Sequence, residues 1–121
     1  MNALNTGSDF WRQLDQLVAT STIVIDRPAG TAHPHYPEFV YSLDYGYLAG
    51  TTAIDGGGVD VWRGSLPDQV VVGVVCTLDL TKRDMEVKIL LGCTPAEMQT
   101  ILAVHNQHTM AGLLLPRPGL D

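Results

Sequence analysis

The pattern of apolar and polar positions predicts a helix close to the start of the chain. Between residues 8 and 19 the apolar side chains follow the i, i+4, i+7, i+8 spacing of one helical face: Phe10, Leu14, Leu17 and Val18. Ser8 stands just before this apolar face and is expected to cap the helix. The helix is expected to end near Ala19.

A second helix is predicted in the last third of the chain. The sequence Thr94-Pro95-Ala96-Glu97 has the capping-box pattern, with proline at the first helical position. One stripe of the following segment collects four side chains: Met98, Ile101, Leu102 and His105. The pattern therefore predicts a helix that begins after Thr94 and packs through this stripe.

Between and after the helices, short runs rich in β-branched and aromatic residues predict strands. These runs cover residues 22–25, 39–41, 45–47, 59–62, 70–80, 85–89 and 112–115. In the 85–89 run apolar and polar residues alternate, so it is expected to form a hairpin with the preceding strand and to turn Glu86 and Lys88 towards water. The pattern predicts an α+β, mainly β chain built round a small barrel, closed or partly open.

Size and composition indicate one globular domain. The chain has 121 residues, of which 45% are hydrophobic, and no apolar run approaches the ~20 residues of a membrane-spanning helix. Its start shows neither a basic segment nor an apolar one typical of a secretory signal, so a cytoplasmic location and no membrane partner are expected. Cys76 and Cys93 lack zinc-ligand spacing and are expected to be inert thiols.

The charge of the chain narrows the possible partners. Seven basic and thirteen acidic residues give a net charge of -6, which argues against binding to the phosphate backbone of nucleic acids. Four basic residues are nevertheless able to converge in three dimensions: Arg27, Lys82, Arg83 and Lys88. The net charge therefore does not argue against a small phosphorylated ligand.

Two pairs of aspartates are candidate ligands for a hard cation. Asp55 and Asp60 flank a run of three glycines, and Asp79 and Asp84 flank a predicted hairpin turn. Carboxylate oxygens in such positions suit Mg²⁺ or Mn²⁺. The alternative is that Asp55 starts an Asp-Gly turn and that the second pair belongs to a charged, solvated hairpin tip.

Other polar residues offer weaker candidates. The phenol of Tyr45 is able to donate a hydrogen bond to a phosphoryl oxygen. His33 and His35 are expected to be exposed loop residues, because no third metal ligand stands near them in the sequence. No nucleophile elbow, Walker loop or dinucleotide-binding glycine pattern occurs, which argues against nucleophilic catalysis.

The central motif resembles that of a known enzyme family. Tyr45-Gly46-Tyr47, a spacer of seven residues and then Asp-Gly-x-x-Val-Asp-Val from Asp55 resemble the signature of the soluble family I inorganic pyrophosphatases. Residues 23–29 are similar to an early strand and proline turn of that family, and residues 73–84 to an acidic hairpin. The resemblance implies a five-stranded OB-like barrel, several Mg²⁺ ions, hydrolysis of pyrophosphate by a metal-activated water, and assembly into homo-oligomers.

The resemblance also implies roles for individual residues. The metal ligands would be Asp26, Asp55, Asp60, Asp79 and Asp84, of which Asp55 and Asp60 would serve catalysis. The groups that bind phosphate or pyrophosphate would be Tyr45, Lys82, Arg83 and Lys88.

The sequence departs from the family pattern at several positions. Gly57 stands where the family has an aspartate that acts on the attacking water, and Glu86 stands where it has a lysine. The segment from Pro28 to Tyr41 is short and contains no lysine or arginine. The prediction is therefore a pyrophosphatase-like protein with a degenerate metal and phosphate site, weakly active or inactive. The alternative is a non-catalytic scaffold or a barrel that binds a partner protein.

Overall fold

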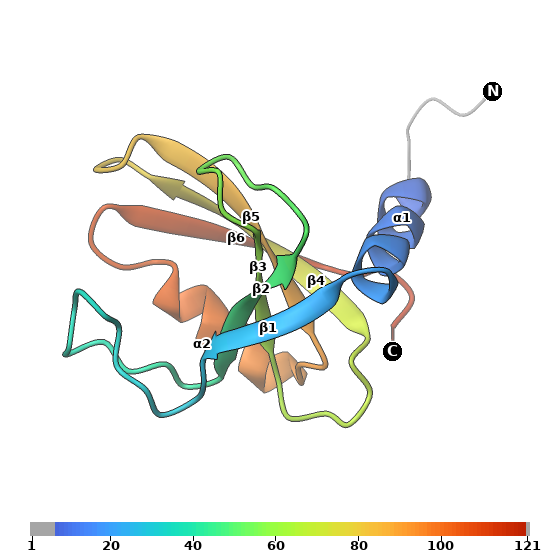
Figure 1. Ribbon diagram of the computed structural model, residues 1–121, viewed down its shortest axis with the longest axis horizontal. Coiled ribbons are helices and arrows are strands. Elements are labelled where there is room, and N and C mark those ends of the chain that lie inside the picture. The colour runs from blue at the N-terminus through green and yellow to red at the C-terminus, as the bar shows by residue number, and fades with distance from the viewer. Residues whose placement is uncertain (1–6, 121) are drawn as a thin grey trace.

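The computed structural model describes residues 7–120, which form two helices and six strands (Figure 1). The predicted helices and most predicted strands are confirmed, with longer bounds for several strands. In chain order the elements are α1 (Ser8–Ala19), β1 (Thr22–Arg27), β2 (Asp44–Ala49), β3 (Val59–Arg63), β4 (Val71–Asp79), β5 (Asp84–Leu91), α2 (Pro95–Val104) and β6 (Met110–Pro116).

All six strands belong to one mixed sheet in the order β1-β2-β3-β5-β4-β6. Neighbouring strands are antiparallel except β3 and β5, which pair in parallel over Val61–Arg63 and Ile89–Leu91. The predicted hairpin of β4 and β5 is confirmed. The outermost strands β1 and β6 do not pair with each other, so the sheet is open and does not close into a barrel. The predicted α+β, mainly β class of the chain is confirmed.

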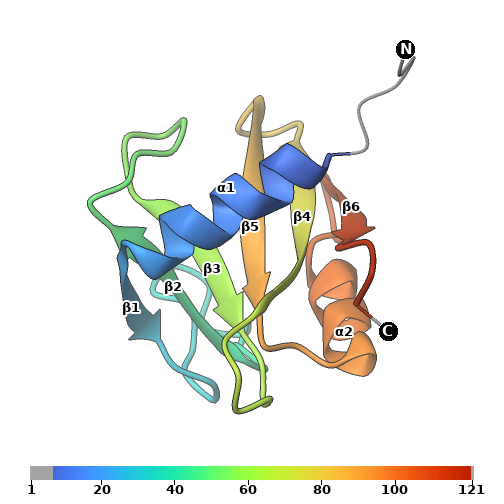
Figure 2. The same cartoon turned by 90° about the vertical axis from the view of Figure 1, so that its right-hand side faces the viewer.

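One face of the sheet packs against α1, which crosses it diagonally (Figure 2). Trp11 and Leu14 of α1 are buried against apolar side chains of five strands: Leu48, Val61, Val71, Val74, Ile89 and Leu91, with Ile23 and Ile25 at the margin. These side chains alternate along their strands, as expected for residues that share one face. Removal of this apolar area from water is the main force that holds α1 to the sheet.

The opposite face of the sheet carries a second core. Trp62, Val75 and Leu90 are buried there with Ile101 of α2 and with Tyr41 of the connection between β1 and β2. The two cores therefore lie on opposite sides of the same strands. Polar residues of the second face are the ones that form the candidate site described below.

The two helix starts differ in how well they follow the sequence prediction. The Thr94 hydroxyl accepts from the Glu97 N–H, and the Glu97 carboxylate accepts from the Thr94 N–H, so the predicted capping box is confirmed. The predicted Ser8 cap is wrong. Ser8 is the first residue inside α1, and the N-cap is Gly7 at φ 81°, with no side-chain capping bond.

Two further predictions need correction. Residues 39–41 do not form a strand of the sheet: their backbone pairs only within the β1–β2 connection, through an isolated bridge of Val40 with Ala32. Glu86 and Lys88 do share one face of β5, but that face is not turned to water. It lies against the second core, and Lys88 is 5% exposed.

The outer edge of β6 is occupied by a side chain. The Asn106 amide accepts from the Gly112 N–H at 3.1 Å and donates to the Gly112 carbonyl at 3.3 Å. Asn106 thus makes the two hydrogen bonds that a neighbouring strand would make. Pro116, at the end of the same strand, has no N–H to offer.

Within residues 7–120, neither helix has the length and apolar character needed to cross a membrane.

Candidate functional site

The candidate site is centred on the ammonium group of Lys88. Its Nζ donates to Asp60 Oδ2 at 2.8 Å, to Tyr45 Oη at 2.9 Å and to Glu86 Oε2 at 3.0 Å. An ammonium group has three protons, so these partners satisfy it fully. The Lys88 side chain is 7% exposed, whereas Asp60 and Glu86 are 27% and 16% exposed.

Three adjacent strands position these four side chains. Tyr45 lies on β2, Asp60 on β3, and Glu86 and Lys88 on β5, so all of them point from the same face of the sheet. Gly46 lets β2 approach β1 closely, because a Cβ at this position would collide with the carbonyl oxygen of Val24. The glycine of the Tyr-Gly-Tyr motif is therefore required for the close packing of β1 and β2 next to the site.

The electrostatics of the cluster keep Lys88 charged and Tyr45 neutral. Burial opposes the charge of Lys88, but its interactions with Tyr45 and Asp60 are together stronger and raise the pKa of Lys88 above its ordinary value. Burial also raises the pKa of Tyr45, and the nearby Asp60 carboxylate adds to this although Lys88 opposes it. Two carboxylates around one ammonium leave the cluster with a net negative charge.

A buried imidazole lies beneath the cluster. The Trp62 indole N–H donates to His105 Nε2 at 3.0 Å, so this nitrogen carries no proton. Burial, and then the positive charge of Lys88, lower the pKa of His105 to about 4. His105 is therefore neutral at physiological pH, and it fixes the Trp62 ring below Tyr45.

An arginine and a group of aromatic rings border the site. Arg27 Nη1 donates to Tyr41 Oη at 2.6 Å, and the guanidinium lies 5.7 Å from the centre of the Tyr41 ring and 6.0 Å from that of Tyr45. His33 stacks near Tyr41, with 6.2 Å between ring centres. Burial and the positive charge of Arg27 lower the pKa of His33, so the imidazole resists protonation there.

The second pair of predicted aspartates has local partners of its own. Asp79 and Asp84 lie opposite each other at the start of the β4–β5 turn. Asp79 accepts from the N–H groups of Thr81 and Lys82 and from the Thr109 hydroxyl, and the Lys82 bond is the largest contribution that lowers the pKa of Asp79. Lys82 and Arg83 lie exposed in this turn, outside the Lys88 cluster.

The glycine-rich turn after β2 shows a similar local arrangement. Asp55 is exposed and accepts from the Gly57 N–H at 2.9 Å, which is the geometry of an Asx turn. Asp26 is exposed on the edge strand β1. Of the residues predicted for the site, the structure thus brings together Tyr45, Asp60 and Lys88, and it engages Asp55 and Asp79 in turns.

This arrangement does not fit a resident cluster of Mg²⁺ or Mn²⁺ ions. Residues 7–120 contain no group of three or more His, Cys, Asp or Glu side chains placed to hold a metal ion. Asp60 and Glu86 are the two carboxylates closest to such a role, and both already neutralise Lys88. A divalent cation bound between them would be repelled by that ammonium and would compete with it for the same carboxylates.

Sequence reasoning did not assign a role in the site to Glu86, Trp62 or His105. The alternation of Glu86 with Lys88 placed the two on one face, but nothing in it indicated that this face is covered. The helical stripe that contains His105 predicted packing, and its pairing with Trp62 joins residues 43 positions apart. Such a pairing leaves no local pattern in the sequence.

The comparisons with known proteins give a result for the fold only. No protein-family model matches the chain, and no curated protein matches its sequence. Among solved structures, an inorganic pyrophosphatase from Coxiella burnetii is similar, with a TM-score of 0.55 and 12% sequence identity over 78% of this chain and 82% of that one. The described chain therefore has a pyrophosphatase-like fold, which is mainly β and consists of an open six-stranded sheet and two helices.

Proposed function

We propose that this chain is a pyrophosphatase-like protein whose acidic site is degenerate, so that it hydrolyses pyrophosphate weakly or not at all. The observation that carries the proposal is the position of Lys88. Its ammonium group lies between Asp60 and Glu86, which are the carboxylates best placed to serve a metal-dependent reaction. Gly57 adds support, because the signature that this motif resembles has a carboxylate at that position.

The charge balance of the site limits what it binds. Lys88 is neutralised by two carboxylates and gives no net positive field to a phosphate group. Arg27 at the border of the site, and Lys82 and Arg83 in the exposed β4–β5 turn, remain as groups that favour a small phosphate ligand. Binding there is expected to be weak, because highly charged phosphates require several desolvated donors.

Phosphate release from pyrophosphate in the presence of Mg²⁺ tests the proposal. The wild type is expected to turn over far below the roughly 1–10³ s⁻¹ typical of enzymes, and Asp60→Asn is expected to abolish any residual activity. Gly57→Asp is the matched gain-of-function variant and is expected to raise the rate if the missing carboxylate is the main defect. A wild type with turnover in the ordinary enzymatic range would contradict the proposal.

A second candidate function is a non-catalytic barrel that binds a partner protein. One observation favours it, namely that the buried Lys88 has all of its partners inside the protein and so serves as a structural group. On this candidate neither phosphate nor Mg²⁺ would raise the thermal stability of the wild type, because a ligand that binds only the folded state must stabilise it.

A further inference from the structure

The helix α1 covers only part of its face of the sheet. Val74 of β4 and Ile89 of β5 pair across the strands and are buried under α1. Farther along the same face, the next pairs are Cys76 with Val87 and Leu78 with Met85, of which Cys76 is half-buried and the other three are exposed. Figure 2 shows the β4–β5 hairpin extending past α1.

Six large apolar side chains and one thiol form this uncovered face. Its members come from β4, β5, β6 and the loop before β3: Ile54, Cys76, Leu78, Met85, Val87, Leu113 and Leu115. Ile54 is 78% exposed, Met85 64% and Leu113 61%. Scattered exposed apolar residues are ordinary, but a contiguous patch on three adjacent strands indicates an interaction surface.

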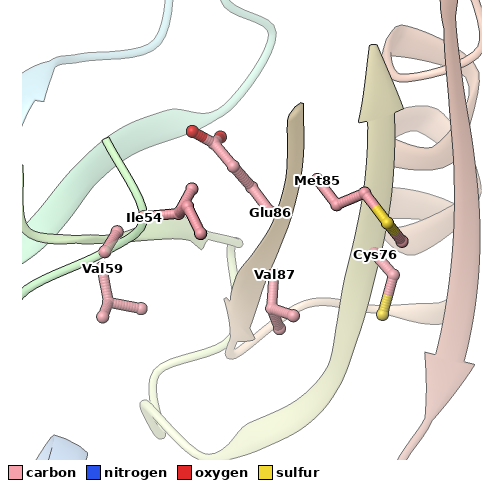
Figure 3. Close-up of a pocket in the computed structure, with 7 residues that line it drawn as sticks. Ile54, Val59, Cys76, Met85, Glu86 and Val87 are labelled. Atoms are coloured by element: carbon pink, nitrogen blue, oxygen red, sulfur yellow. The ribbon is translucent and has the colours of Figure 1, made fainter. Parts of the chain in front are cut away.

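The middle of this uncovered face is hollow. Strands β3 and β5 pair only from Val61 and Ile89 onwards, and before that point they separate. An open cavity of about 340 Å³ lies at the separation (Figure 3), with Ile54 and Val59 on one side and Met85 and Val87 on the other. The lining is almost wholly apolar, with Glu86 the one charged side chain among seven lining residues.

The area of the uncovered face matches one side of a protein dimer. The exposed fractions of its six large side chains correspond to an area on the order of 700 Å², against about 800 Å² per partner in a standard interface. The members of the face carry no charge, and homodimer interfaces are the class most enriched in apolar area. The charged residues that give each copy its net charge of -6 therefore lie outside this contact.

We propose that the uncovered face is the interface of a homodimer, in which the same face of a second copy of this chain covers it. A two-fold axis would place β4, β5 and β6 of one copy against the same strands of its partner, in the way that two sheets pack about 10 Å apart in sandwiches. Self-association by pairing of edge strands is disfavoured at β6, because the Asn106 side chain already bonds the N–H and carbonyl groups of Gly112. The inference does not depend on the chemistry proposed for the Lys88 cluster.

Sedimentation analysis of the full chain over a range of micromolar concentrations tests the inference. The wild type is expected to be a dimer, and Leu113→Asp and Met85→Asp are each expected to weaken dimerisation by at least ~100-fold, because a charge would be buried without a partner. Val40→Asp is the matched control, since Val40 is 56% exposed but lies on the loop between β1 and β2. A monomeric wild type, or a dimer that both variants leave intact, would overturn the inference.

A spin label gives a second measurement that does not require a disruptive charge. The label is attached at Met85→Cys in a Cys76→Ser background, while burial raises the pKa of Cys93 to about 12 and keeps that thiol unreactive. Its mobility is expected to fall as the protein concentration rises, and a label at Val40→Cys is expected to stay mobile. Equal mobility of the Met85 label at all concentrations would count against the interface.

Discussion

Lys88 Nζ and Asp60 Oδ2 lie 2.8 Å apart and join two parts of the sheet, since Lys88 is on β5 and Asp60 on β3. Glu86 completes the arrangement on the other side of the same ammonium, 3.0 Å away. Two carboxylates share one internal cation, which compensates most of their charge and leaves a net negative charge of one. In physical terms Lys88 has the position that a bound cation would otherwise take.

Replacement of Lys88 is therefore expected to create a cation site. Lys88→Ser leaves Asp60 and Glu86 without their shared partner, and the free energy of unfolding is expected to fall by about 3 kcal/mol. Mn²⁺ at a hundredfold excess over its Kd is expected to stabilise the variant by about 3 kcal/mol, which offsets most of this loss, and to raise its melting temperature by several degrees. Calorimetry in the presence and absence of Mn²⁺ measures both effects.

Lys82→Ser is the control for this experiment, because Lys82 is exposed and lies outside the cluster. It is expected to change neither the stability nor the response to Mn²⁺. If Mn²⁺ stabilised the wild type as much as Lys88→Ser, Lys88 would not be the group that excludes the cation.

The buried His105 is expected to make stability depend on pH. Its pKa is about 4 in the folded protein and about 6.5 in an unfolded chain. The unfolded state therefore takes up the proton first as the pH falls, and stability is lost between about pH 6.5 and pH 4. The expected loss from pH 7 to pH 5 is about 2 kcal/mol, measured by urea unfolding.

His105→Gln separates this effect from the other titrating groups. The carboxylates of Asp15, Asp44, Asp79 and Glu97 have lowered pKa values, so their contribution to stability is lost only at more acid pH. The variant is expected to lose the part of the pH dependence between pH 7 and pH 5 that comes from His105, and His33, whose pKa is also lowered, is expected to keep the rest. An unchanged slope in this range would show that His105 is not its source.

The glycine of the Tyr-Gly-Tyr motif is expected to be intolerant of any side chain. In Gly46→Ala the added Cβ would overlap the Val24 carbonyl oxygen and approach Ile25 Cα to 2.8 Å. Backbone atoms cannot move aside as a flexible side chain can, so a loss of about 3 kcal/mol or more is expected.

Gly57→Ala is the matched comparison, since its Cβ would meet only Asp55 Oδ1 at 3.4 Å. Its melting temperature is expected to stay close to that of the wild type. Equal losses in the two variants would mean that the clash at Gly46 is relieved by movement of β1.

Removal of the Asn106 amide is expected to open the outer edge of β6. Asn106→Ala leaves the N–H and carbonyl of Gly112 without their side-chain partner, and a loss of about 1 kcal/mol is expected. A free apolar edge also promotes strand pairing between molecules. Faster growth of thioflavin-binding aggregates in the variant is the expected readout, with Gln107→Ala as the control on the same turn.

Local signals in the sequence were sufficient for several parts of the fold. The Thr94 capping box involves residues three apart, and its geometry follows from the sequence alone. The alternation in residues 85–89 correctly predicted that Glu86 and Lys88 share a face. It did not predict burial of Lys88, because the cover comes from Tyr45 and Asp60, which lie 43 and 28 positions away.

The carboxylates of Asp55 and Asp60 illustrate the same limit. The spacing of Asp55 and Asp60 placed both residues around one turn, and the turn is present. Spacing does not determine the direction of the two carboxylates, and Asp55 is held by the Gly57 N–H whereas Asp60 points to Lys88. Residues 39–41 have the composition of a strand, but their backbone partners are the short segment 30–33 of the same loop and not a strand of the sheet.

The parallel pairing of β3 with β5 has a consequence for the order of folding. It is the one junction between the β1-β2-β3 meander and the β4-β5-β6 unit within the sheet. Tyr45 and Asp60 belong to the first unit and Lys88 to the second, so neither unit contains the site by itself. The environment of Lys88 therefore forms only when the two units join, and it reports that step of assembly.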